Sequence, residues 1–225
     1  MPKAFVLFLL LAILLGVVGA IVAVSIGTEE DLFAGVRVPP PVHGDLDQPP
    51  RHIWESDSAE PGPLAAEATY RAMLDSLVAG YAGAGETPAA AYSAWRRFNT
   101  APYPSATHGR RLVNNYVNER GAAEYGRFEQ ARPMPVGTVI AKDSFVVTEE
   151  GRSAAGPLFV MEKMADGFNE VSGNWRYNMI LPDGALFGVT RGSSAEKVEF
   201  CIGCHLAREA DDHLYFVPPA FRPGG

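Results

Sequence analysis

This sequence of 225 residues has little cysteine, a deficit of positive charge and no internal repeat. Cysteine occurs only twice, so no thiol is left for work outside one short motif. The formal net charge of −7 argues against a nucleic-acid partner, which requires a basic face. It also argues against electrostatic adhesion to anionic lipid. The length allows one domain with extensions, or two small domains.

The two cysteines stand in Cys201-Ile202-Gly203-Cys204-His205, where a histidine directly follows the second thiol. This spacing is the attachment signature of c-type haem. Two thiols one helical turn apart can reach the two vinyl groups on one edge of a porphyrin and become thioethers. The histidine then lies under the macrocycle as the proximal iron ligand. The motif therefore predicts one covalent haem c, held by Cys201 and Cys204 and ligated by His205.

Two other uses of these thiols fit less well. A thioredoxin-like redox pair should lie near a βαβ pattern, whereas this motif follows the charged segment 196–200. A zinc site requires four ligands. Cys201, Cys204 and His205 supply three, so His213 would have to be recruited.

At the start of the sequence, residues 4–26 form an apolar run without a charge. As a helix it would span roughly 34 Å, enough to cross a bilayer core. A signal peptide has an apolar region of only about 7–15 residues, which favours an uncleaved anchor, although cleavage after Ala20 or Ala23 stays open. Lys3 before the run and the acidic residues 29–31 after it place the remainder outside. We therefore expect a single-pass protein of the bacterial inner membrane with its C-terminal domain in the periplasm, where c-type haem is attached.

Proline content and apolar periodicity divide the chain further. Proline pairs and a triplet prevent helices and favour an extended linker before residue 63. Apolar positions at near-helical spacing over 64–81, and a second helix over 89–98, predict a helical pair. The expected segments are a transmembrane anchor over 1–27, the linker over 28–62, a helical extension over 63–104 and a monohaem domain over 105–225.

Later segments are rich in β-branched and aromatic residues and are bounded by turn residues such as Pro182-Asp183-Gly184. Short turns between strands indicate an antiparallel sheet. The fold class that we expect is α+β: a mainly antiparallel β-sheet haem domain with a C-terminal haem-attachment helix, preceded by the helical pair and one N-terminal transmembrane helix. Strands are predicted over 111–118, 137–148, 157–164 and 174–181, with helices over 119–128 and 195–207.

Three features together resemble the cytochrome P-460 family, which includes the cytochromes c′-beta. They are the strand Gly137-Thr138-Val139-Ile140-Ala141-Lys142-Asp143, the step Gly173-Asn174-Trp175 and the C-terminal Cys-x-x-Cys-His. The resemblance implies a mainly antiparallel sheet, one covalent haem and often a homodimer. In the catalytic branch a strand lysine is cross-linked to the porphyrin, and hydroxylamine is oxidised to nitrous oxide or nitric oxide. In the cytochrome c′-beta branch there is no cross-link, the distal face is apolar and the haem binds nitric oxide.

The resemblance places Lys142 at the cross-linking position. On a strand, Lys142 shares a face with Ile140 and Ser144, and a lysine on such a mixed face is usually solvated. Both interpretations of Lys142 stay open. Arg111 lies near the position of the family's distal arginine, with Arg110 as its competitor.

Hydroxylamine oxidation also requires a distal base that accepts protons as the nitrogen is oxidised. The catalytic branch has a distal glutamate in the hairpin before its Gly-Asn-Trp step, where this chain is shorter. The candidate carboxylates here are Glu162, Asp166 and Glu170.

A protein side chain could instead be the sixth iron ligand. Met161 and Met164 point to opposite faces of their strand, so at most one could approach the iron. A Met/His pair would raise the reduction potential and suit electron transfer, although methionine on a strand is more often core filler. His108 is the third candidate.

Three functions therefore stay open. The first is a membrane-anchored periplasmic cytochrome whose open distal site acts on or binds small nitrogen species. The second is an electron-transfer cytochrome with a protein sixth ligand. The third is an accessory haem subunit, docked to a membrane complex through residues 4–26 and the helical pair. The expected partners are a redox protein or membrane complex, a small nitrogen ligand and a second copy of the chain.

Overall fold

The computed structural model describes residues 41–42 and 58–224, which lie within one compact unit spanning Val36–Gly225. The anchor expected over 1–27 and most of the linker expected over 28–62 lie outside the described residues. Among the helices that are described, none is long and apolar enough to cross a membrane.

A single sheet forms the centre of this unit, and β5 is the strand on which the others are built. β4 pairs along one edge of β5, while β6 and β7 follow one another along the opposite edge. β8 and β9 extend the sheet beyond β7, and β2 and β3 pair with the outer edge of β4. All these pairings are antiparallel; β1 pairs with β6 in parallel. The strands are β1 (Pro41–Val42), β2 (Arg96–Arg97), β3 (Tyr103–Pro104), β4 (Leu112–Val117), β5 (Val139–Val147), β6 (Ser153–Ala155), β7 (Leu158–Lys163), β8 (Trp175–Ile180) and β9 (Leu186–Val189).

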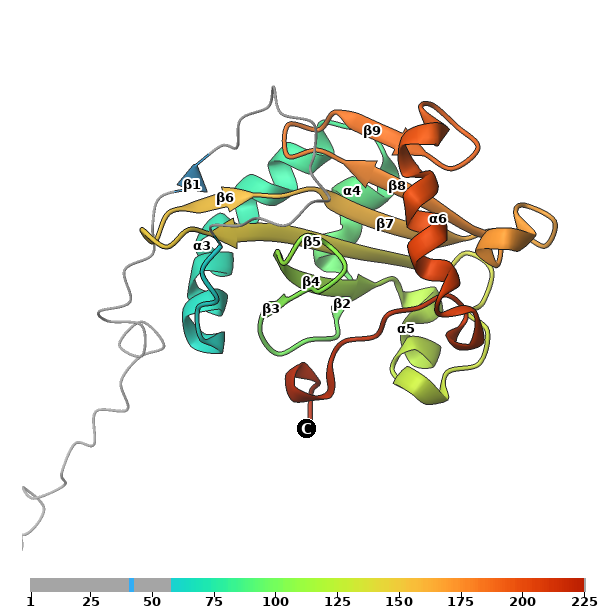
Figure 1. Ribbon diagram of the computed structural model, residues 1–225, viewed down its shortest axis with the longest axis horizontal. Helices are drawn as coiled ribbons and strands as arrows, with labels where there is room; N and C mark the ends of the chain where they lie inside the picture. The colour runs from blue at the N-terminus through green and yellow to red at the C-terminus, as the bar shows by residue number, and fades with distance from the viewer. Residues whose placement is uncertain (1–40, 43–57, 225) are drawn as a thin grey trace, which may run out of the picture. The chain divides into compact units, whose positions relative to one another are not determined.

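Helices cover both faces of this sheet. In Figure 1, α6 crosses the strands on the side of the viewer, and α3 and α4 lie behind them. The α-helices are α3 (Pro63–Ala82), α4 (Thr87–Ala91), α5 (Glu119–Tyr125) and α6 (Glu199–Leu206). The 3-10 turns are η2 (Tyr92–Ala94), η3 (Phe128–Gln130), η4 (Glu170–Ser172), η5 (Ala195–Val198), η6 (Glu209–Asp211) and η7 (Pro219–Phe221).

Two hydrophobic clusters lie on the two faces, because side chains alternate along each strand. The first contains the buried stripe of α3 together with Ala141 and Phe145 of β5. α3 starts at Pro63, whose fixed φ suits a first helical turn. The second cluster contains Ile140 of β5 and Trp175 of β8 and packs under α6. The sheet therefore separates an α3 face from an α6 face.

The expected α+β class with a mainly antiparallel sheet and a few helices is confirmed. The expected helix over 89–98 is wrong in its second half, since α4 ends at Ala91 and Arg96–Arg97 form strand β2. Pairing with β4 decides this, because the backbone N–H of Phe98 donates to the carbonyl of Asn115 at 2.9 Å. Strands β6 and β9 were not expected. The segment 63–104 supplies core helices and two strands to the same unit as the sheet.

Candidate functional site

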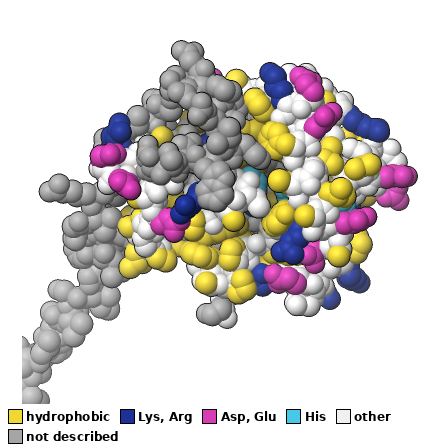
Figure 2. Space-filling model, viewed as in Figure 1, with side chains coloured by type: hydrophobic (Ala, Val, Ile, Leu, Met, Phe, Trp, Pro, Cys, Tyr) yellow, Lys and Arg dark blue, Asp and Glu magenta, His cyan; other side chains and the backbone are white. Residues whose placement is uncertain are grey.

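A cleft lies between α6 and the sheet, on the α6 face. Its empty volume is about 660 Å³, counted with the part that opens to solvent. On the visible part of this side of the molecule, hydrophobic side chains gather near the middle and charged side chains lie mainly toward the edge (Figure 2). The lining residues are Thr107, His108, Asn115, Tyr125, Ile140, Lys142, Phe159, Val160, Met161, Tyr177, Asn178, Phe200, Cys201, Cys204, His205, Leu214 and Tyr215.

The two cysteines and the histidine of the Cys-x-x-Cys-His motif line one wall of this cleft. Its cysteines lie one turn apart on α6, with Cys201 half-buried and Cys204 exposed. Burial, with the neighbouring Cys204 as a smaller cause, raises the pKa of Cys201 to about 12. A redox-active pair needs a thiolate with a lowered pKa. The environment of Cys201 therefore disfavours the thioredoxin-like alternative.

His205 is held in the tautomer that an iron ligand requires. Its Nδ1–H donates to the backbone carbonyl of His213 at 2.6 Å. Burial lowers the pKa of His205 to about 4, so the imidazole is neutral. Because Nδ1 carries the proton, Nε2 presents a lone pair. A hydrogen bond from the second ring nitrogen to a carbonyl is how metal-bound histidines are normally fixed.

The rest of the cleft fits a haem c on this wall. The buried Tyr177 hydroxyl and the Asn178 Oδ1 both line the cleft and have no hydrogen-bond partner within the described part of the chain. Buried polar atoms without a hydrogen-bond partner are uncommon in native proteins, and a group bound in the cleft would explain these two. Around them the lining is mainly apolar and aromatic, as a macrocycle needs.

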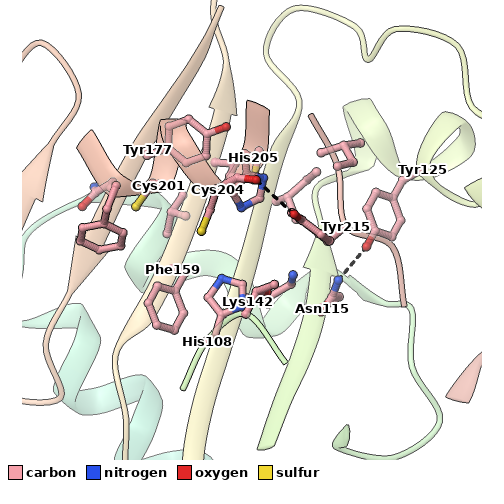
Figure 3. Close-up of a pocket in the computed structure, with 17 residues that line it drawn as sticks. His108, Asn115, Tyr125, Lys142, Phe159, Tyr177, Cys201, Cys204, His205 and Tyr215 are labelled. Atoms are coloured by element: carbon pink, nitrogen blue, oxygen red, sulfur yellow. Dashed lines mark hydrogen bonds between the residues drawn. The ribbon is translucent and has the colours of Figure 1, made fainter. Parts of the chain in front are cut away.

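The opposite wall carries His108 and Phe159. Figure 3 shows both side chains facing the motif of Cys201, Cys204 and His205 across the cleft. The two rings pack with their centroids 4.5 Å apart. The Nδ1 of His108 lies 2.9 Å from the hydroxyl oxygen of Ser105, which fixes the ring. This wall is the distal side for any group that His205 ligates.

Lys142 also points into the cleft rather than into solvent. Its side chain is almost fully buried, and burial alone lowers the pKa of its amine to about 8. Among the described residues no hydrogen bond or ion pair to its Nζ is found. The solvated alternative for Lys142 is therefore wrong, because the α6 face at this point is enclosed by the motif helix.

Of the sixth-ligand candidates, His108 and Met161 line the cleft. Met164 is half-buried beyond the end of β7 and is not part of the lining. Arg111 does not line the cleft either: its guanidinium donates to the carbonyl of His108 at 3.3 Å and so supports the distal loop. Arg110 forms an exposed ion pair with Glu60.

None of the three expected carboxylates reaches the cleft. Glu162 forms an ion pair with Arg176 at 3.0 Å, because alternation turns it away from Met161. Asp166 and Glu170 are exposed on the connection between β7 and β8. Among the described residues, the lining contains neither aspartate nor glutamate.

The sequence reasoning missed several polar groups of the lining, among them Asn115 and Tyr177. Asn115 donates through Nδ2 to the Tyr125 hydroxyl at 2.6 Å, which joins β4 to α5 beside the cleft. Tyr177 packs its ring 5.1 Å from that of His205. Strand alternation in 111–118 and 174–181 could have pointed to both, since each polar group lies on the apolar face of its strand.

The comparison with known families agrees with this geometry. Residues 89–216, more than half of the chain, match the family Cytochrome P460. The chain belongs to the cytochrome P460 family. Membership supports a c-type haem protein that binds iron through its haem, and the match includes both walls of the cleft. No curated protein matches the sequence.

Proposed function

We propose that this cytochrome P460 family protein carries one haem c on Cys201 and Cys204, with His205 as proximal ligand, and binds nitric oxide on the distal side. The haem would supply an iron site with one open position. The observation that carries the proposal is the composition of the distal wall, where Phe159 and His108 face the motif and no described carboxylate lines the cleft. A cleft lining without a carboxylate suits a small, neutral ligand.

The protein side chains have separate roles in this proposal. His205 offers Nε2 while the His213 carbonyl holds the ring. Phe159 excludes water from the distal side by covering it with an aromatic ring. His108, whose Nδ1 contacts Ser105 and whose ring packs on Phe159, is a polar side chain on this wall.

Oxidation of hydroxylamine is the second candidate, and the position of Lys142 favours it. A buried amine whose pKa is near 8 is partly neutral at ordinary pH, the form in which nitrogen is a nucleophile. Lys142 faces the same cleft as the haem motif, as a cross-link to the porphyrin would require. His108 would then take the place of the missing carboxylate as base.

We also propose that residues 4–26 anchor the protein in the bacterial inner membrane and that the haem unit faces the periplasm. Support comes from the length of the apolar run and from the charges that flank it. Sedimentation with membranes that survives a salt wash, and an intact N-terminus, are the expected results. A soluble form that begins near Ile21 or Val24 would instead show a cleaved signal.

The optical spectrum of the reduced protein, before and after addition of nitric oxide or carbon monoxide, tests the proposed function. An open site gives a high-spin ferrous spectrum and rapid ligand binding. A low-spin spectrum that becomes high-spin in Met161→Leu or His108→Ala would support the electron-transfer alternative. A red-shifted Soret band that returns to an ordinary c-type position in Lys142→Met would support the cross-linked enzyme. An ordinary high-spin spectrum that does not respond to nitric oxide would refute the binding proposal.

A further inference from the structure

The His213 carbonyl, which accepts the hydrogen bond from His205 Nδ1, lies in an unusual stretch of backbone. Asp212 and His213 both have left-handed φ angles, of 52° and 64°. Residues other than glycine rarely adopt this region, and two in succession require support from neighbouring groups. The support comes from outside the motif helix, on strands β7 and β8.

Lys163, the last residue of β7, is the main support. Its Nζ donates to Asp212 Oδ1 at 2.5 Å and to the carbonyl of Gly173 at 2.9 Å. The side chains of Lys163 and Asp212 are only 11% and 12% exposed. Charged hydrogen bonds shielded from water are stronger than exposed ones. The pair therefore ties the chain after α6 to the end of the sheet.

Two further bonds fix Asp212 from other directions. The backbone N–H of Met134 donates to its Oδ2 at 2.7 Å, and the indole N–H of Trp175 donates to its carbonyl at 2.9 Å. Both side-chain oxygens and the main-chain oxygen of Asp212 are thus occupied. The residue has no freedom to rotate without breaking contacts to three separate parts of the chain.

Gly173 completes the arrangement. A Cβ at this position would lie 2.4 Å from Cδ2 and 2.6 Å from Nε2 of His213, so only glycine leaves room for that ring. Its own φ of 59° is also left-handed. The Gly173-Asn174-Trp175 step therefore contacts the segment Asp212–His213 twice, through the space at Gly173 and through the Trp175 indole.

We propose that Lys163 and Asp212 are positioning residues for the proximal histidine. By fixing the His213 carbonyl, they set the strength of the hydrogen bond from His205 Nδ1, and with it the electron donation of the imidazole to iron. Groups that act through such a hydrogen bond orient a metal-bound histidine and raise its basicity. The inference rests on the haem attachment proposed above and does not depend on which nitrogen species the distal side takes.

The test compares variants of the matured, haem-loaded protein. Lys163→Met removes the charge and keeps the stem, Asp212→Asn keeps the shape, and Lys163→Arg keeps the charge. Arg176→Met is the matched control, because it breaks the neighbouring Glu162 ion pair, which joins β7 to β8 and does not include Asp212. The measurements are the ferric/ferrous midpoint potential and the iron–histidine stretching frequency of the ferrous protein.

A weaker bond to the His213 carbonyl makes His205 a poorer donor, which disfavours ferric iron. We expect Lys163→Met and Asp212→Asn to shift the ferric/ferrous equilibrium about tenfold toward ferrous, which is 59 mV for one electron. The stretching frequency should fall in both, while Lys163→Arg and Arg176→Met stay near wild type. If Lys163→Met does not fold, the same measurements on Asp212→Asn and Trp175→Phe test the positioning role.

Shifts in Lys163→Met and Asp212→Asn no larger than that of Arg176→Met would overturn the positioning role. Intact mass separates this failure from failure of the proposed function. A wild-type protein without an added haem defeats both proposals, whereas a haem-loaded protein with unresponsive variants defeats the positioning role alone.

Discussion

The two faces of β5 differ in whether a buried charged side chain has hydrogen-bond partners. Lys142 and Asp143 are neighbours in the chain and both are buried, one on the α6 face and the other on the α3 face. Asp143 accepts hydrogen bonds from the Tyr70 hydroxyl at 2.7 Å, the Tyr92 hydroxyl at 3.1 Å and Asn114 Nδ2 at 2.9 Å. Lys142 has no such partner among the described residues.

The difference indicates that the α3 face serves stability and the α6 face serves binding. The hydrogen-bonded network around Asp143 makes this part of the α3 face rigid and specifies one packing. On the α6 face, the Tyr177 hydroxyl and the Asn178 Oδ1 have no partner among the described residues, and both residues line the cleft that a ligand would complete. The same strand therefore contributes a structural anchor and a site residue at consecutive positions.

The largest expected effect is on the α6 face. Cys204→Ala should abolish normal maturation, because one of the two thioethers cannot form. Intact-mass analysis should show one added haem in the wild type and none, or a loosely held one, in the variant. Tyr215→Phe, which removes only the hydroxyl contact to the Cys204 carbonyl, is the control. Extraction of haem from the wild type by acid acetone would contradict the covalent attachment.

A large loss of stability is expected on the α3 face. Asp143→Ala leaves Tyr70, Tyr92 and Asn114 with buried donors that have lost their acceptor, so the free energy of unfolding should fall by about 3 kcal/mol. Denaturant unfolding monitored by circular dichroism measures it. The exposed Asp166→Ala should stay within about 0.5 kcal/mol of wild type. Equal effects of the two substitutions would show that the Asp143 cluster does not stabilise the fold.

A smaller, pH-dependent effect is expected for Lys142. Its pKa is about 8 in the folded chain against 10.5 for a free lysine. Between these values the unfolded chain binds the proton that the folded chain has released, so the free energy of unfolding rises with pH. The difference between wild type and Lys142→Met should change with pH in that window. An amine bonded to the porphyrin no longer titrates, so a constant difference would support the cross-link.

The smallest effect is expected for Met161, which lines the cleft but belongs to the hydrophobic cluster of the α6 face. Met161→Leu conserves volume and should cost less than about 1.5 kcal/mol. The ferrous spectrum should keep its spin state. A change from low to high spin in this variant would identify Met161 as the sixth ligand instead.

Local signals predicted much of the fold. The four strands expected over 111–118, 137–148, 157–164 and 174–181 correspond to β4, β5, β7 and β8, because alternation and turn residues are read from the sequence alone. β6 and β9 are short and owe their conformation to pairing with β5 and β8. The end of α4 was missed for the same reason, since the pairing of Arg96–Arg97 with β4 overrides a helical pattern.

The candidate site also has one part that the sequence predicts and another that depends on the fold. A covalent haem motif is local in sequence, because two thiols and an imidazole must lie within two turns of one helix, and the residues 201–205 specify it by themselves. The distal wall and the contacts that hold the segment Asp212–His213 are not local in the sequence. His108 and Phe159 are distant in the chain, and so are Lys163 and Asp212. Folding brings the first pair together on the wall opposite the motif, and it brings Lys163 at the end of β7 into contact with Asp212 after α6. Strand alternation within the folded sheet likewise decides that Lys142 is buried in the cleft, which lowers its pKa. The same alternation turns Glu162 away from the cleft.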